Sequence, residues 1–115
     1  NQTEEFSDEA LFQKINSYIY THYTNPDLSV AMIADVFSLT PIKASRIFRQ
    51  NNADGIPALI NQLRIEKAKI ILKESNNNLE EIAVQIGFTN TKTFTRAFKR
   101  FENTTPGRYR DSVAT

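Results

Sequence analysis

The sequence contains no cysteine among its 115 residues, which excludes a disulfide scaffold, cysteine-ligated zinc and a thiol nucleophile. A single histidine, His22, excludes any metal or catalytic site that needs two imidazole groups, and three glycines leave no phosphate-cradling loop. No apolar run approaches the ~18 residues of a membrane span, and no charged leader followed by an apolar stretch suggests export. We therefore expect a cytoplasmic module that is not an enzyme, holds no metal or cofactor and makes no membrane contact through this segment.

A length of 115 residues favours one domain of common size or two very small ones. A chain of this length buries roughly two thirds of its unfolded surface, so it can form a core without covalent cross-links. Because the first residue is asparagine, we expect a fragment of a longer polypeptide.

The charged residues are distributed unevenly, although the net charge of the chain is only +1. Residues 1–37 carry one basic and six acidic side chains, whereas residues 38–115 carry 13 basic and seven acidic ones. From Phe88 to Arg110 there are six basic residues and a single acid, Glu102. This polarity suggests an anionic partner for the C-terminal part, although solvated helix surfaces explain the charge alone equally well.

Apolar residues at helical spacing, with capping residues at the expected ends, predict an all-α protein of about seven helices with no strand candidate. Asn78 can cap a helix start, Thr40-Pro41 pairs an N-cap with a first-turn proline, and Gly87 can close a helix in the left-handed conformation. The stretch 57–75 is apolar on two sides, which is typical of a helix packed between two bodies. The expected helices cover residues 7–23, 29–37, 40–50, 57–75, 78–86 and 91–101, with a short last one from residue 105.

Two stretches of the chain share one plan of a short helix, a tight turn and a second helix. The first is DLSVAMIADVFSLTPIKASRIFRQ, residues 27–50, and the second is NLEEIAVQIGFTNTKTFTRAFKRF, residues 78–101. Their Ile-Ala and Phe-basic pairs align at an offset of 49 to 50 residues. Each stretch is therefore predicted to be a helix-turn-helix, whose second helix can enter the major groove of DNA.

The second helix of each stretch is expected to separate an apolar side from a basic side. The inward residues are Ala44, Ile47 and Phe48 in the first helix, and Phe94, Ala97, Phe98 and Phe101 in the second. The outward residues are Lys43, Arg46 and Arg49 in the first, and Lys92, Thr95, Arg96 and Lys99 in the second. Arginine can donate two hydrogen bonds to the acceptor atoms of guanine, while Ile42 and the methyl groups of Thr91 or Thr95 can contact thymine methyls.

Two motifs carry a family resemblance that covers about residues 28–110. The segment EEIAVQIGFTNTKTFTRAFKRFENTTPGRYR, residues 80–110, resembles the signature of the AraC/XylS family of bacterial transcription regulators. The segment LRIEKAKIIL, residues 63–72, is similar to the linker-helix pattern of that family. The resemblance implies two helix-turn-helix subdomains joined by a long linker helix, with both second helices in successive major grooves of one duplex, and a function in regulating transcription.

The resemblance also suggests how the chain is divided. We expect residues 1–6 to be a linker or chain end, 7–55 the first helix-turn-helix subdomain, 56–75 the linker helix, 76–112 the second subdomain and 113–115 a tail. Nineteen helical residues, 57–75, span about 28 Å at ~1.5 Å each. This length is comparable with the ~34 Å between successive major grooves on one side of DNA.

The DNA contacts implied by the resemblance fall into two groups. Base-reading positions correspond to Ile42, Lys43, Ser45 and Arg46 in the first unit and to Asn90, Thr91, Lys92, Thr95 and Arg96 in the second. Phosphate contacts, which set affinity and register rather than sequence preference, are expected from Thr40, Arg49, Lys99 and Arg100. The implied partners are double-stranded DNA, a sensor or dimerisation domain before Asn1, and RNA polymerase.

Several residues depart from the family pattern or invite another interpretation. Gly55 follows Phe48 by seven residues where the family usually has about five, and Asn103 stands where glycine is common. Arg64 points into an apolar stripe, so a structural role with a buried partner is favoured over a DNA contact. Tyr18, Tyr20 and Tyr23 are expected to pack the first helix, and the alternative is an exposed face toward a missing domain.

Other classes of function explain less of the sequence. A helical protein-interaction module accounts for the helices but not for the paired basic faces. RNA binding lacks an exposed aromatic platform, because the phenylalanines are expected to point inward. Neighbouring carboxylates such as Glu80 and Glu81 point to different sides of a helix, so they cannot flank one substrate as catalytic pairs do.

Overall fold

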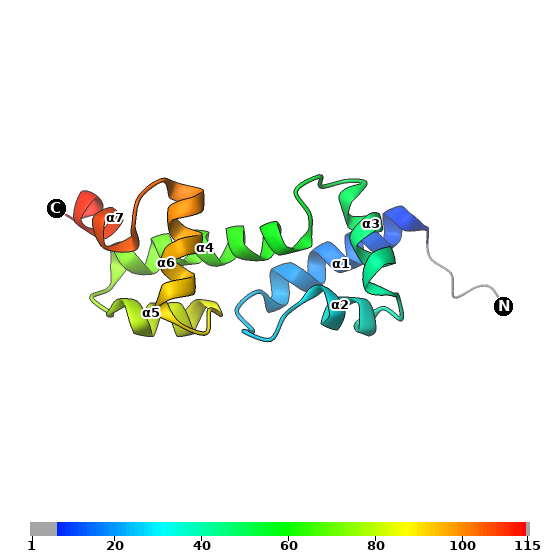
Figure 1. Ribbon diagram of the computed structural model, residues 1–115, viewed down its shortest axis with the longest axis horizontal. Coiled ribbons are helices and arrows are strands. Elements are labelled where there is room, and N and C mark those ends of the chain that lie inside the picture. Colours follow the sequence, from blue (N-terminus) through cyan, green and yellow to red (C-terminus); the bar gives the residue numbers. More distant parts are fainter. Residues whose placement is uncertain (1–6, 115) are drawn as a thin grey trace. The chain divides into compact units, whose positions relative to one another are not determined.

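The structure is a computed structural model that describes residues 7–114. This part of the chain contains seven α-helices and no strand, which confirms the all-α prediction (Figure 1). The expected helix ends differ from the observed ones by one residue at most. None of these helices combines the length and apolarity needed to cross a membrane. The helices are α1 (Asp8–His22), α2 (Val30–Val36), α3 (Pro41–Arg49), α4 (Ile56–Glu74), α5 (Leu79–Ile86), α6 (Thr91–Glu102) and α7 (Pro106–Val113).

The helices are distributed over two compact units. Unit 1 contains the residues up to His22 together with Asp27–Ile60, and unit 2 contains Tyr23–Pro26 and the residues from Asn61 onward. The first residues of α4 therefore belong to unit 1 and the remainder to unit 2. The segments expected from the sequence are defined by function, as two subdomains and a linker helix, whereas these two units are defined by compactness. The expected segment bounds therefore stay a prediction.

Unit 1 packs α1, α2 and α3 around a core of aliphatic side chains and Phe48. The Phe48 ring is fully buried, and its centroid lies 5.1 Å from that of Phe12 on α1. The rings of Tyr18 and Phe37 pack edge to face, as expected, but Tyr20 is 54% exposed, so packing is wrong for Tyr20 and the alternative of an exposed side holds there. Tyr20 follows Tyr18 by two helical positions, about 200° around the helix, which turns it toward solvent.

Unit 2 packs α5, α6 and α7 against the later part of α4. The fully buried Phe94 and Phe98 form the centre of its core, and Tyr109 of α7 packs against it. Phe101 is expected to point inward, but it is 37% exposed, so that prediction is wrong. The second apolar side expected of α4 is not fully covered, because Ile70 on that side is 52% exposed. Helical periodicity gives the direction in which a side chain points, but not whether another element covers it. The buried residues of the core are Ile65, Ala68, Leu72, Ile82, Ala83, Ile86, Phe88, Phe94 and Phe98.

The turns that separate α2 from α3 and α5 from α6 close in the same way. Gly87 has a φ of 103°, which confirms the predicted left-handed C-cap, and the amide of Phe88 donates to the carbonyl of Ala83 at 2.9 Å. In unit 1 the corresponding left-handed residue is Ser38, with a φ of 57°, and the amide of Leu39 donates to the carbonyl of Ala34 at 2.8 Å. The two turns therefore share one geometry, although only the second uses glycine.

We expect Ser38→Gly to stabilise the protein by about 0.5–1 kcal/mol, because glycine adopts the left-handed conformation without the steric cost of a Cβ atom. Thermal unfolding followed by circular dichroism measures the change. Ser17→Gly is a matched control in the middle of α1, where glycine is a poor helix former and should lower the stability. A Ser38→Gly variant that melts below the unsubstituted chain would contradict the expectation.

Arg64 of α4 is only 7% exposed and has the structural role expected from the sequence. Its Nε donates to the carbonyl of Tyr23 at 2.7 Å, and its Nη2 donates to the carbonyl of Asn25 at 2.9 Å. The guanidinium also lies 5.3 Å from the ring centroid of Phe88, and burial lowers the pKa of Arg64. The side chain therefore fixes the segment 23–26 against α4 and the turn before α6, all within unit 2.

Candidate nucleic-acid interface

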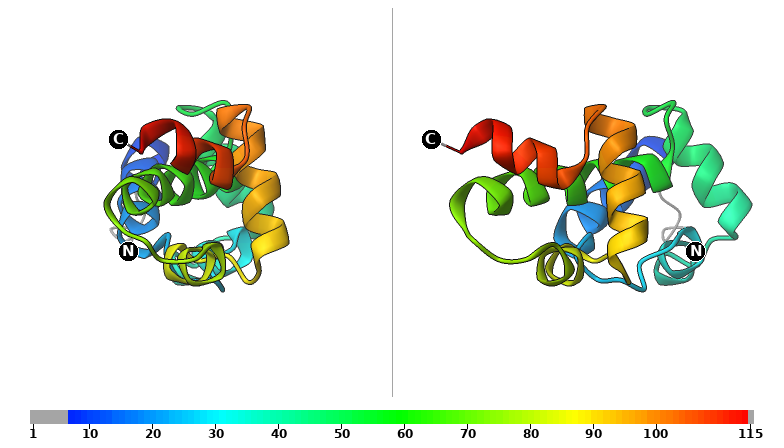
Figure 2. Two further views of the ribbon diagram at one scale, coloured as in Figure 1. Left: turned by 90° about the vertical axis from the view of Figure 1, so that its left-hand side faces the viewer. Right: turned by 60° about the vertical axis from the view of Figure 1, so that its left-hand side comes forward.

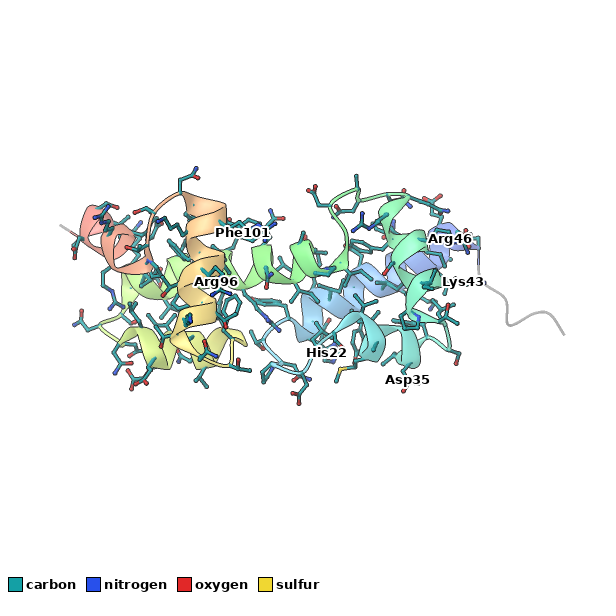
Figure 3. All side chains as sticks on the ribbon, in the orientation of Figure 1. His22, Asp35, Lys43, Arg46, Arg96 and Phe101 are labelled. Atoms are coloured by element: carbon teal, nitrogen blue, oxygen red, sulfur yellow. The ribbon has the colours of Figure 1, made fainter. Side chains whose placement is uncertain are left out.

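The helix α3 is the second helix of the first helix-turn-helix, and it separates its two sides as predicted. Thr40 caps its start by accepting a hydrogen bond from the amide of Lys43 at 3.1 Å. One side buries Ala44, Ile47 and Phe48 completely in the core of unit 1. The other side exposes Ile42, at 82%, together with Lys43 and Arg46, whose positions on α3 are labelled in Figure 3. Ser45 is half-buried between the two sides.

Arg49, at the end of α3, lies beside the loop in which the sequence departs from the family pattern. Gly55 of that loop has a φ of 92°, and a Cβ atom placed on it would lie 3.1 Å from Nη2 of Arg49. The guanidinium therefore lies against the loop backbone while the residue as a whole remains exposed. The longer loop therefore contacts the Arg49 side chain through the backbone at Gly55. A phosphate contact by Arg49 stays a prediction.

The helix α6 is the corresponding second helix of the second helix-turn-helix. Figure 2 shows α5 nearly end-on while α6 crosses the view, so the two helices meet at the steep angle typical of this motif. Phe94 and Phe98 are fully buried on the inner side of α6. The exposed side carries four basic residues within 12 helical positions: Lys92, Arg96, Lys99 and Arg100. Figure 3 places Arg96 on α6, and Thr95 is half-buried beside it.

Asn90 and Thr91, two of the positions expected to read bases, have local structural roles. The side-chain oxygen of Asn90 caps α6 by accepting from the amide of Thr93 at 2.8 Å, and its amide nitrogen donates to the hydroxyl of Thr89 at 3.5 Å. The hydroxyl of Thr91 is buried and has no hydrogen-bond partner in the structure. Base reading by these two residues stays a prediction. The capping role of Asn90 was missed, although an asparagine at the start of an apolar helical pattern is a recognised N-cap signal.

The arrangement provides positive charge and hydrogen-bond donors on two helices, each supported by a packed core. Residues 7–114 contain no group of three or more side chains that could hold a metal ion. Exposed arginine and lysine on a helix can contact phosphates and the acceptor atoms of guanine in a major groove. Each unit therefore contains one surface suited to duplex DNA.

Comparison with known proteins connects this arrangement to a family. A sequence model of the helix-turn-helix domain matches residues 33–112. The chain is 31% identical over 102 residues to YijO of Escherichia coli K12, named as an HTH-type transcriptional regulator, and the match covers 89% of this chain and 36% of YijO. A second regulator of that organism, YpdC, is 29% identical over 101 residues, which cover 35% of its length. The chain thus spans about a third of the length of these relatives.

Solved structures show the same fold. The C-terminal domain of AraT, a response regulator from Geobacillus stearothermophilus, matches with a TM-score of 0.85 and 26% identity over 89% of this chain and 84% of that one. The DNA-binding domain of AdpA in complex with a target DNA matches with a TM-score of 0.80 and 19% identity, over 88% and 90% of the two chains. The chain belongs to the helix-turn-helix family that includes the DNA-binding domains of AraC-type transcription regulators.

Proposed function

We propose that this chain is the DNA-binding part of a bacterial transcription regulator, and that it reads the sequence of duplex DNA with α3 and α6. Each helix enters a major groove, and the two grooves follow one another along the same duplex. The cytoplasm, where bacterial DNA lies, is the compartment that this function requires. The proposal assigns the chain no catalytic step.

One observation carries the proposal: the second helix of each helix-turn-helix has fully buried core residues on one side and exposed basic side chains on the other. On α6 the buried side is aromatic, and the exposed side carries the four basic residues Lys92, Arg96, Lys99 and Arg100. A recognition helix needs this division, because the core fixes its orientation while the exposed side chains reach base edges and phosphates. A protein-interaction module has no need for the same basic side on two repeated helices.

The comparisons support the proposal and suggest the rest of the regulator. The AdpA domain, whose fold this chain shares, has been solved with a target DNA, and AraT is described as a response regulator. Relatives of this chain extend well beyond the matched part. We therefore propose that a sensor or dimerisation domain accompanies this module in the full regulator, and that RNA polymerase is a further partner.

The experiment compares Arg96→Ala with Lys99→Ala on duplexes selected from a random pool. Arg96 is exposed in the middle of α6, opposite Phe94 and Phe98, where a side chain can reach a base edge. Because a pair of hydrogen bonds from one arginine to guanine is worth ~1–3 kcal/mol of discrimination between bases, Arg96→Ala should remove the preference for a particular base at one or two base pairs. Lys99→Ala should instead weaken all sequences alike and reduce the dependence of log K on log salt by about one unit.

A scan of every base pair in the selected site with both variants measures these effects. For the unsubstituted chain, four to seven phosphate contacts predict a salt slope of roughly −4 to −6. Equal affinity for selected and random duplexes at low salt would refute sequence-specific reading. If both variants bind all sequences more weakly by the same factor, Arg96 contacts a phosphate rather than a base. If both variants keep the full base preference, α6 does not read the DNA sequence.

A further inference from the structure

The single acidic residue of α6, Glu102, is held away from the basic side of that helix. Glu102 lies three residues after Lys99, a spacing at which helical side chains of opposite charge can pair. The ion pair that the structure shows is a different one, in which Oε1 of Glu102 lies 3.3 Å from Nζ of Lys69 on α4. Lys99 has no ion-pair partner among residues 7–114, so its charge remains available.

Lys69 is fixed in this position by several groups of unit 2. Its Nζ lies 3.8 Å from Oε2 of Glu66, one turn earlier on α4, and 5.9 Å from the ring centroid of Tyr109 on α7. The side chains of Lys69 and Glu102 are 27% and 20% exposed, so water screens their pair less than it screens a pair at the surface. Burial alone lowers the pKa of Lys69, but the hydrogen bond and charge of Glu102 outweigh this and raise it. Lys69 therefore stays charged at neutral pH.

We propose that Lys69 is a positioning residue for DNA binding by α6: it binds the Glu102 carboxylate and so keeps Lys99 available for a DNA phosphate. This inference rests on the proposed function and adds to it a residue outside both recognition helices. Without Lys69, the carboxylate is free to turn toward Lys99 and compete with the phosphate for the same ammonium group. Glu102 is also the only acid between Phe88 and Arg110, so its unmasked charge would repel the DNA backbone.

The test uses the whole chain and the duplex selected for it. Lys69→Met should weaken binding about 3–10-fold near 0.1 M salt and reduce the salt slope by up to one unit, because Lys99 is then neutralised within the protein. Lys67→Met removes one positive charge from an exposed position of the same helix and gives the same net charge, so it controls for charge alone. Adding Glu102→Gln to Lys69→Met should restore the affinity to within about twofold and restore the slope.

The outcomes separate this role from two others. If Lys69 serves only to hold α6 in place, the double variant stays weak, because it also lacks the ion pair, and the salt slope does not change. If Lys69 itself contacts a phosphate, Glu102→Gln removes a repulsive charge but does not restore the salt slope, because the lost phosphate contact is not replaced. Either result overturns the inference but leaves the proposed function intact. The same holds if the Lys69→Met and Lys67→Met variants bind DNA with equal affinity. Failure of the unsubstituted chain to prefer the selected duplex overturns both.

Discussion

Phe98→Ala should lower the free energy of unfolding of unit 2 by about 3–5 kcal/mol, which is the usual cost of truncating a buried phenylalanine. The ring is fully buried and makes edge contacts with two others, at 6.0 Å from Phe94 and 5.5 Å from Tyr109. Its removal leaves a cavity where α6 and α7 pack together. Because small domains are commonly stable by only ~5–15 kcal/mol, the variant should lose much of its helical order in unit 2.

Amide hydrogen exchange in α5, α6 and α7 measures the effect locally, and urea unfolding measures it for the chain as a whole. Phe101→Ala is the matched control, since it removes the same ring from the same helix at a position that is 37% exposed. That variant should lose far less stability, because less apolar surface leaves the core. Equal losses for the two variants would mean that Phe101 is buried in solution as the sequence pattern suggested.

The fold was largely predictable because local signals and apolar periodicity agree along this chain. Asn78 caps α5 through a reciprocal capping box with Glu81, and Gly87 ends the same helix in the left-handed conformation. The repeated Ile-Ala and Phe-basic pairs predicted two helix-turn-helix units, and the second helices bury Phe48, Phe94 and Phe98 as expected. These signals act over one or two helical turns, which is the range that a sequence pattern describes well.

Features that depend on contacts between distant segments were not predictable in this way. Tyr20 and Phe101 were expected to be buried, but they are 54% and 37% exposed. The pairing of Lys69 with Glu102 joins residues 33 positions apart, and no local pattern indicates it. For the candidate site, the exposure of Lys92 and Arg96 followed from helical geometry, whereas the buried hydroxyl of Thr91 depends on its particular surroundings in unit 2.

Gly87 also lies close to residues that are distant in sequence, and these neighbours determine how a substitution of Gly87 should change the stability of unit 2. A Cβ atom on Gly87 would lie 2.9 Å from Nε of Arg64 and 2.9 Å from the carbonyl oxygens of Tyr23 and Thr24. Two of these three neighbours are backbone atoms, which cannot move aside as the end of a flexible side chain can. The third is the buried arginine that holds the segment 23–26 by hydrogen bonds to two carbonyls.

Gly87→Ala should therefore destabilise unit 2 by about 2–5 kcal/mol. Roughly 1–2 kcal/mol comes from placing an L-residue at a φ of 103°, and overpacking against the backbone adds about 1–3 kcal/mol. Gly107→Ala is the control, because a Cβ atom there meets nothing within 4 Å and alanine favours the helix α7. Urea unfolding of both variants measures the difference. A Gly87→Ala chain as stable as Gly107→Ala would show that Arg64 and the segment 23–26 can shift without cost.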